Sequence, residues 1–300
     1  MKKKIYIGTR TSELAVTQSK LVGAAIQKVL SETEIEYIMK MTEGDRILNK
    51  PLLEFGGKGV FVSEFEQALL KGEIDLAVHS AKDLPMELEP GLGIVAVPER
   101  EDPRDVLITP AGCEDFKSKK EIVIGTSSLR RQLQIQEIGK EMWPWASVRC
   151  ENLRGNVPTR LGKLTDGLYD GIILAAAGIK RLGLEEDKRY QYHYFDCETF
   201  IPAGGQGILA VEGRVEGETA ELVRGIQNQE AFICLMLERK ILRLLDAGCH
   251  EPIGVYSRVK GDQIEVFGIN RRNEQTRKIH LWGEIEQTAA LAEEAARGLM

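Results

Sequence analysis

The sequence contains the same kind of strand–turn–helix segment twice. Ile5-Tyr6-Ile7-Gly8-Thr9 and Ile122-Val123-Ile124-Gly125-Thr126 are short apolar runs that end in a polar turn, and a helical pattern follows each of them. Gly72-Glu73-Ile74-Asp75 and Gly167-Leu168-Tyr169-Asp170 likewise each precede an apolar run. Because the offsets differ, these are structural echoes rather than a sequence repeat. The pattern predicts two similar α/β lobes, and ligands usually bind between such lobes.

Several secondary-structure elements follow from local patterns in the first lobe. We expect a helix from about Ser12 to Leu30 and a buried strand over Ile74–His79. Between them, Ser63 and Glu66 have the spacing of a capping box, and Gly72 is a plausible end of the helix that this box begins.

The later part of the chain changes character. Pro98–Pro103 resembles a crossover between the lobes, and the apolar run Gly171–Ala177 reads as a strand. After a long helical pattern, Gly261-Asp262 has the composition of a two-residue II′ hairpin turn. This predicts a small C-terminal α+β domain. Its expected elements are a helix over Glu218–Leu245, strands over Val255–Lys260, Ile264–Asn270 and Thr276–Trp282, and a closing helix over Glu284–Leu299.

Composition limits the class of protein. The chain has 300 residues, enough for two or three compact units, and its 43% hydrophobic and 29% charged residues exclude a disordered, fibrous or membrane-spanning class. Its net charge of −6 argues against nonspecific nucleic-acid binding. The apolar run Ile5–Ile7 is too short for an export signal, so we expect a cytoplasmic protein without membrane or nucleic-acid partners.

Five arginines follow expected strands at equivalent points of the two lobes. Arg130 and Arg131 lie in the first turn of a helix, where cations oppose the helix dipole at a cost of about 0.3–1 kcal/mol each. A ligand anion would reverse that sign. Surface arginines paired with local acids are the alternative. Because Arg10, Arg154 and Arg160 lie at similar strand ends, we favour a ligand with several carboxylates or phosphates.

A second candidate is the loop after the strand that ends at His79. Asp83 beside Lys82 is either a solvated ion pair or a carboxylate in a cleft, where it would stabilise a developing cation or move a proton. The spacing alone does not choose between these.

The cysteines are odd in number and scattered, which does not indicate a disulfide framework. A lone cysteine is usually a small buried hydrophobe. Cys249, however, lies between Gly248 and Pro252 on a tight loop, which favours access and reactivity. Only four histidines are present, and none has ligand spacing, so no metal site is expected. A Cys–His hydrolase would need a partner that no feature identifies.

Together these segments resemble the hydroxymethylbilane synthases, or porphobilinogen deaminases. The resemblance covers about the first 255 residues, and Glu54 and Ala247 depart from the common pattern. The segments that carry it are Ile7–Ser12, Gly56–Phe61, His79–Pro85, Glu99–Asp105, Gly125–Gln132, Leu153–Asn156, Pro202–Gly207 and Gly248–Gly254.

The resemblance implies the fold and the reaction. Two lobes like those of periplasmic binding proteins, residues 1–98 with 199–216 and residues 103–195, would be joined to a C-terminal α+β domain, residues 218–300, with a three-stranded antiparallel sheet. The family condenses four porphobilinogen molecules head to tail with loss of ammonia, then releases linear hydroxymethylbilane by hydrolysis. It does so on a dipyrromethane cofactor, which a thioether would attach to Cys249. A monomer is expected.

The resemblance also implies roles for individual residues. Asp83 would be the catalytic carboxylate. The cofactor-binding residues would be Cys249, Lys82, Asp83, Ser128, Arg130, Arg131, Arg154 and Gly155. The substrate-binding residues would be Arg10, Ser12, Lys58, Phe61, Arg154, Arg160 and Gln206. The main rival function is a solute-binding module for an anionic ligand, with the same lobes and no turnover.

Overall fold

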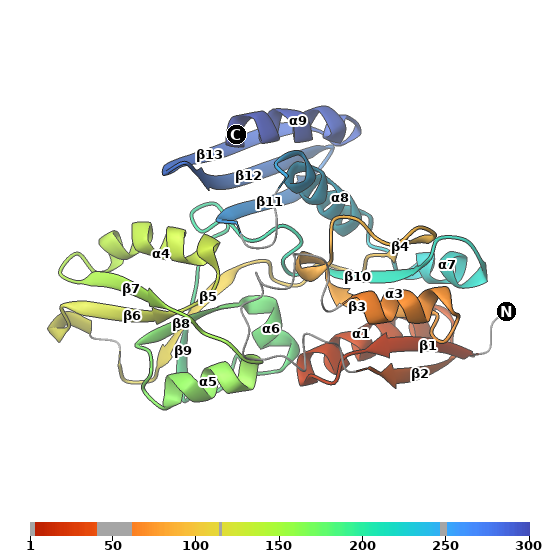
Figure 1. Cartoon of the computed structure of the whole chain (residues 1–300), viewed down its shortest axis with the longest axis horizontal. Helices are drawn as coiled ribbons and strands as arrows, with labels where there is room; N and C mark the ends of the chain where they lie inside the picture. The colour runs from red at the N-terminus through yellow and green to blue at the C-terminus, as the bar shows by residue number, and fades with distance from the viewer. Residues whose placement is uncertain (1–3, 41–61, 114–115, 247–250) are drawn as a thin grey trace.

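The computed structural model describes residues 4–40, 62–113, 116–246 and 251–300, which form three sheets (Figure 1). The first sheet has the order β2-β1-β3-β10-β4, with β1 parallel to β2 and β3, and β10 antiparallel to β3 and β4. Its strands are β1 (Lys4–Thr9), β2 (Glu34–Met39), β3 (Leu76–Ser80), β4 (Leu92–Ala96) and β10 (Leu209–Arg214). Its helical elements are α1 (Glu13–Val29), α3 (Ser63–Leu70), η2 (Ala81–Asp83), α7 (Glu218–Val223) and η4 (Arg224–Ile226).

The second sheet repeats this arrangement. Its order is β7-β6-β8-β5-β9, with β6 parallel to β7 and β8, and β5 antiparallel to β8 and β9. The strands are β5 (Asp105–Pro110), β6 (Glu121–Gly125), β7 (Ser147–Glu151), β8 (Gly171–Ala175) and β9 (Tyr190–Tyr194). The helical elements are η3 (Phe116–Ser118), α4 (Leu129–Met142), α5 (Val157–Thr165) and α6 (Ala176–Arg181). In each lobe the antiparallel strand is the one on which the chain arrives from the other lobe. The prediction of two similar α/β lobes is confirmed.

The C-terminal unit is an antiparallel sheet in the order β11-β12-β13. One face packs on α8 and α9, while Tyr256 and Phe267 on the other face pack against Leu133 of α4 in the second lobe. Gly261 has a φ of +62°, the positive value that the expected hairpin turn requires. The elements are α8 (Gln229–Leu244), β11 (Ile253–Lys260), β12 (Gln263–Arg272), β13 (Gln275–Glu284), η5 (Ile285–Gln287) and α9 (Thr288–Leu299). The predicted small α+β domain is confirmed.

Some local predictions are wrong. The single helix expected over Glu218–Leu245 is interrupted after η4, and Asn228 caps a new helix by accepting a hydrogen bond from the Ala231 amide at 2.9 Å. Ser63 is the first residue of α3 rather than its cap, and Glu66 accepts a hydrogen bond from the backbone of Glu89 instead of closing a capping box.

The two crossovers between the lobes pack directly on each other. The Glu101 amide donates to the Gly207 carbonyl at 3.1 Å, so the segment from β4 to β5 is bonded to the segment from β9 to β10. Gly207 has a φ of +86°, and a Cβ there would lie 2.2 Å from the Glu101 carbonyl oxygen. Glycine is therefore required where the crossovers meet.

The Trp143-Pro144-Trp145 segment is accounted for by packing. Trp143 is buried edge-on against Phe116, and the Trp145 indole donates to the Phe116 carbonyl at 3.1 Å. Separately, none of the helices within the described ranges has both the length and the apolar character needed to cross a membrane.

Candidate functional site

The residues that we expected to form a site follow the carboxyl ends of parallel strands in both lobes. In open α/β sheets, ligands bind beyond these ends. Arg10 and Ser12 follow β1, and Lys82 and Asp83 form part of η2 directly after β3. In the second lobe, Ser128, Arg130 and Arg131 follow β6, while Arg154, Gly155 and Arg160 follow β7.

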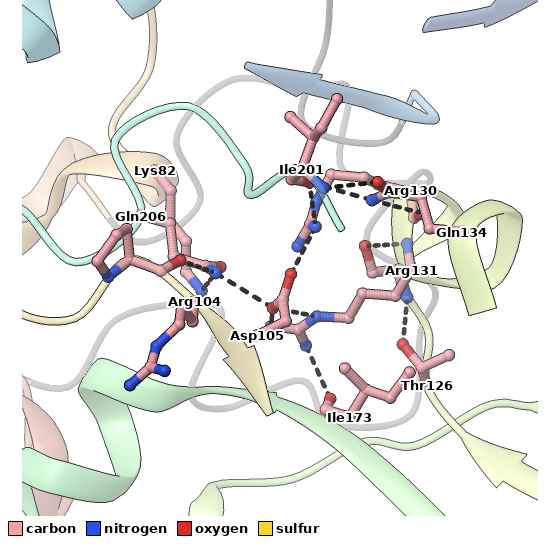
Figure 2. A network of polar contacts seen from close by, with 12 residues as sticks. Lys82, Arg104, Asp105, Thr126, Arg130, Arg131, Gln134, Ile173, Ile201 and Gln206 are labelled. Atoms are coloured by element: carbon pink, nitrogen blue, oxygen red, sulfur yellow. Dashed lines mark hydrogen bonds and ion pairs between the residues drawn. The ribbon is translucent and has the colours of Figure 1, made fainter. Parts of the chain in front are cut away.

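A buried ion-pair network lies at the second-lobe side of this site (Figure 2). Asp105, at the start of β5, accepts from Arg130 Nη1 at 2.6 Å and lies 2.7 Å from Arg131 Nη2. Both arginines also donate to backbone carbonyls, Arg130 to Ile201 at 2.7 Å and Arg131 to Ile173 at 2.9 Å. Burial opposes ionisation of Asp105, but the charges of Arg130 and Arg131 outweigh it and hold its pKa well below its usual range.

This network explains how two arginines are tolerated in the first turn of α4. Ser128 caps the helix, its hydroxyl accepting from the Arg131 amide at 3.5 Å. The side chains of Arg130 and Arg131 are only 4% and 9% exposed, and Asp105 places a full negative charge beside them. The chain itself therefore supplies one anion for this helix start.

The other cations of the site, Arg160 and Lys82, are less fully compensated by nearby negative charge. Burial, together with the nearby charges of Arg131 and Arg154, lowers the pKa of Arg160 to about 10, while Asp83 acts in the opposite direction. Burial also lowers the pKa of Lys82 to about 8. The charge of Asp83, which is exposed, acts on Lys82 of its own lobe and on Arg131 and Arg160 of the second lobe. Lowered pKa values of this kind indicate a place that an anion would stabilise.

Gln206 joins the two sides. It is 1% exposed, and its amide nitrogen donates to the Pro103 carbonyl at 2.8 Å and to Asp105 Oδ1 at 3.1 Å. Its amide oxygen accepts from Lys82 Nζ at 3.4 Å. A lobe-one lysine and a lobe-two carboxylate are therefore connected through one side chain.

The loops of the other predicted residues are held by local contacts. The Ser12 hydroxyl accepts from the Ala15 amide at 3.4 Å and caps α1. Gly155 has a φ of +118°, and its carbonyl accepts from Arg160 Nε at 2.7 Å, which folds the loop after β7 back on α5. Arg10 and Arg154 are partly buried. Three predicted site residues, Lys58, Phe61 and Cys249, lie outside the described residues.

The described cysteines differ in their environments. Burial raises the pKa of Cys197 to about 12 and the pKa of both Cys150 and Cys234 to about 11, so these thiols are poor nucleophiles at neutral pH. Cys113 is exposed, but it follows the C-terminal end of β5, whereas Asp105 and the candidate site lie at the N-terminal end of that strand.

Sequence reasoning missed the residues that hold the site together. The sequence signal for Asp105 is an acid at the head of the apolar run Val106-Leu107-Ile108 of β5. Glu238 is fully buried on α8 and accepts from Arg100 Nη1 at 2.8 Å, from the Gly205 amide at 2.6 Å and from the Ser257 amide at 2.8 Å. An acid at helical spacing among apolar residues was its available signal. This pair ties the C-terminal domain to both crossovers.

Comparisons with known proteins agree with the resemblance found in the sequence. Residues 5–221 match the family described as "Porphobilinogen deaminase, dipyromethane cofactor binding domain", and residues 232–299 match "Porphobilinogen deaminase, C-terminal domain".

Individual relatives carry the same description. A porphobilinogen deaminase of Ruminiclostridium josui is 44% identical over 267 residues, which cover 89% of this chain and 87% of the relative. One of Alkaliphilus metalliredigens is 41% identical over 290 residues, covering 96% of this chain and 89% of the relative. Among solved structures, the methionine binding protein MetQ superposes with a TM-score of 0.45 at 13% identity, covering 77% of this chain and 93% of that chain.

Proposed function

The chain belongs to the porphobilinogen deaminase family, and we propose that Asp83 and the cations around it form its active site. The reaction of the family is hydroxymethylbilane synthesis in the tetrapyrrole pathway. This chain condenses four porphobilinogen molecules head to tail with loss of ammonia, on a dipyrromethane cofactor, and releases hydroxymethylbilane.

One observation carries the assignment of the site. Asp83 is exposed and its charge acts on Lys82 of the first lobe and Arg160 of the second, whose pKa values are lowered mainly by burial. Each porphobilinogen unit carries an acetate and a propionate, so a growing pyrrole chain brings many negative charges. Such a ligand would stabilise cations that the folded chain leaves incompletely compensated.

The residues that would hold the dipyrromethane fit its chemistry, because they are mostly cations and hydrogen-bond donors. When bound, the group would supply the free pyrrole carbon to which the first porphobilinogen unit is joined, and later units would extend the chain from there. Cys249 would provide its thioether, and the raised pKa values of three of the described thiols favour this choice. The residues that would bind it are Lys82, Asp83, Ser128, Arg130, Arg131, Arg154 and Gly155.

The substrate would be bound by residues of both lobes and of the segment before α3. Its carboxylates would be bound by Arg10, Ser12, Lys58, Arg154 and Arg160, with Phe61 covering the cleft and Gln206 at its base. Asp83 would protonate the departing amine and stabilise positive charge that develops on the pyrrole. Its exposure supports this role, because a catalytic acid has to reach the reacting atoms.

The boundaries and the state of the protein belong to the same proposal. Residues 1–98 with 199–216 would form the first domain, 103–195 the second and 218–300 the third, since each range contains one sheet. At the start of the last range, Val223 of α7 belongs to the core of the first sheet. The protein would act as a cytoplasmic monomer.

The intact mass of the purified protein tests the cofactor assignment. We expect a wild-type mass above that of the bare chain by two linked pyrrole units, and no excess in Cys249→Ala. An excess that persists in Cys249→Ala would refute the attachment site. If the wild type has the bare mass, incubation with porphobilinogen should add the missing units, and failure to add them would refute the proposal.

A further inference from the structure

Gln206 lies at the junction of the two lobes, and its backbone is fixed on both sides. Its amide donates to the Ala203 carbonyl at 2.9 Å, and its carbonyl accepts from Arg100 Nε at 2.9 Å. Arg100 is in turn paired with the buried Glu238. Gly205 packs closely on the backbone of the Lys82 loop, and a Cβ at Gly205 would lie 3.1 Å from the backbone nitrogen of Lys82. The side chain therefore begins from a defined position.

The orientation of the Gln206 amide is also determined. Its nitrogen lies within hydrogen-bond distance of two atoms that only accept, the Pro103 carbonyl and the Asp105 carboxylate. Asp105 cannot turn away, because Arg130 and Arg131 hold both of its oxygens. The amide oxygen is thus directed at Lys82 Nζ (Figure 2).

We propose that Gln206 is a positioning residue, whose oriented amide holds the Lys82 ammonium beside Asp83 and ties it to the anchored carboxylate of Asp105. This rests on the proposed function, since it assumes that Lys82 and Asp83 belong to the active site. It also gives Gln206 a different task from direct contact with substrate, because at 1% exposure its polar atoms already have partners within the chain.

The charges around Lys82 make the proposal measurable. Burial lowers its pKa to about 8, Arg131 and Arg130 act in the same direction, and Asp83 and Asp105 act against them. Gln206 accepts a hydrogen bond from the charged form. Removing that acceptor therefore lowers the Lys82 pKa further, whereas a carboxylate in its place raises it.

Two substitutions of similar size test these opposite signs. Gln206→Met removes the amide, and Gln206→Glu replaces it with a carboxylate. The rate at which acetic anhydride acetylates Lys82 is measured at several pH values by peptide mass spectrometry. The pH at which half of the Lys82 amine is deprotonated is the Lys82 midpoint. We expect Gln206→Met to lower the midpoint by roughly 0.5–1 pH unit and Gln206→Glu to raise it, the scale of one hydrogen bond to a charged group.

Turnover is measured with porphobilinogen in the same variants. For Gln206→Met we expect kcat to fall about tenfold or more, with KM changed less than about threefold and the alkaline limb of the kcat profile moved to lower pH. Gln134→Met is the matched control. Gln134 is also 1% exposed and holds the Ile201 amide and carbonyl, at 2.6 and 3.0 Å, so its loss weakens packing without touching Lys82.

Three outcomes would overturn the positioning role. These are an unchanged Lys82 midpoint in both Gln206 variants, an equal shift in Gln134→Met, or shifted midpoints with an unchanged kcat profile. Failure of the proposed function is distinguishable from these. Wild-type turnover by Lys82→Ala would refute the site itself, and the positioning role with it, whatever the midpoints show.

Discussion

At the end of β3 in the first lobe, Ser80 pairs with Leu209 of β10, and the chain continues into Ala81-Lys82-Asp83. At the end of β8 in the second lobe, Ala175 pairs with Asp105 of β5, and the chain continues into α6. The hydrogen-bonding pattern is the same at both ends, down to an amide of the following residue bonded to the carbonyl before the partner strand. The same backbone arrangement thus presents Lys82 and Asp83, the pair that we propose for catalysis, in one lobe, and the buried carboxylate of Asp105 in the other.

The difference lies in how much of each charge is available. Asp105 is fully buried and forms ion pairs with two arginines, so its charge is neutralised within the protein. Asp83 is exposed on a short 3₁₀ turn. Two lobes with the same fold therefore differ in function under our proposal: the buried network rigidifies the second lobe, and the exposed carboxylate of the first would act on the ligand.

Replacing the exposed carboxylate should give the largest effect. We expect Asp83→Asn to reduce kcat about 10²–10⁴-fold, the usual contribution of a positioned acid, with an unchanged melting midpoint. Asp166→Asn, an exposed acid at the end of α5, is the control and should retain turnover. Steady-state assays of porphobilinogen consumption make the measurement. Near-normal turnover by Asp83→Asn would show that the carboxylate does not act in the reaction.

Replacing the buried carboxylate should act on stability. Asp105→Asn leaves two buried guanidinium groups without a counter-charge, and we expect a loss of about 3–5 kcal/mol in the free energy of unfolding at pH 7. Because the pKa of Asp105 is lowered on folding, its contribution is present above its unfolded value and is lost as pH falls through the folded one. The difference between variant and wild type should therefore shrink in strong acid.

Urea unfolding at several pH values tests this prediction. Asp187→Asn is the matched control, since Asp187 pairs with the exposed Arg189 at 2.6 Å in the same lobe and should change stability little. Equal losses from both substitutions would contradict the anchoring role of Asp105.

The sequence predicted both lobes because their signals are local. An apolar run, a polar turn and a helical pattern lie within about thirty residues, and the strands and helices form close to where these patterns indicate them. An exception is the strand expected over Gly171–Ala177, which ends at Ala175, where α6 follows. The break after η4 has a weak local signal, because residues 218–245 keep a helical pattern throughout. In the structure α7 ends at Val223 and η4 at Ile226, and the Asn228 side chain caps the start of α8.

The site was predicted as a set of residues but not as an arrangement. Which arginine meets which acid depends on pairing between distant segments: Arg130 and Asp105 are 25 residues apart, and Lys82 and Gln206 are 124 apart. Strand order decides these contacts, and spacing along the chain carries no information on it. For this reason the motif around Arg130 predicted a ligand anion, whereas the structure adds an internal one.

Replacing a second-lobe cation outside the Asp105–Arg130–Arg131 network should have an intermediate effect on turnover. Arg154 adds positive charge near Arg160, and we expect Arg154→Leu to raise KM for porphobilinogen about tenfold or more, the scale of a lost charge-assisted hydrogen bond. It should also raise the Arg160 pKa by removing a like charge. Arg149→Leu is the control, because Arg149 is exposed on β7 and paired with Glu121 at 2.9 Å. An unchanged KM in Arg154→Leu would remove Arg154 from the binding site.

The smallest effect should come from a buried carboxylate of the first lobe with the opposite pH dependence. Burial raises the pKa of Glu66, with Glu212 and Glu89 adding to the rise, while the Glu89 amide and His79 oppose it. A raised folded pKa means that ionising Glu66 costs stability as pH rises. Glu66→Gln retains an acceptor for the Glu89 amide, found at 3.0 Å, and removes that charge. We therefore expect the free energy of unfolding at pH 7 to rise by less than about 1 kcal/mol, and the difference from wild type to vanish below about pH 4.

Glu73→Gln on the same lobe is the control and should instead lower the free energy of unfolding, since Lys40 at 2.7 Å lowers the Glu73 pKa. If Glu66→Gln destabilised the protein at neutral pH, its carboxylate would have to be a stabilising charge, and the contrast with Asp105 would fail.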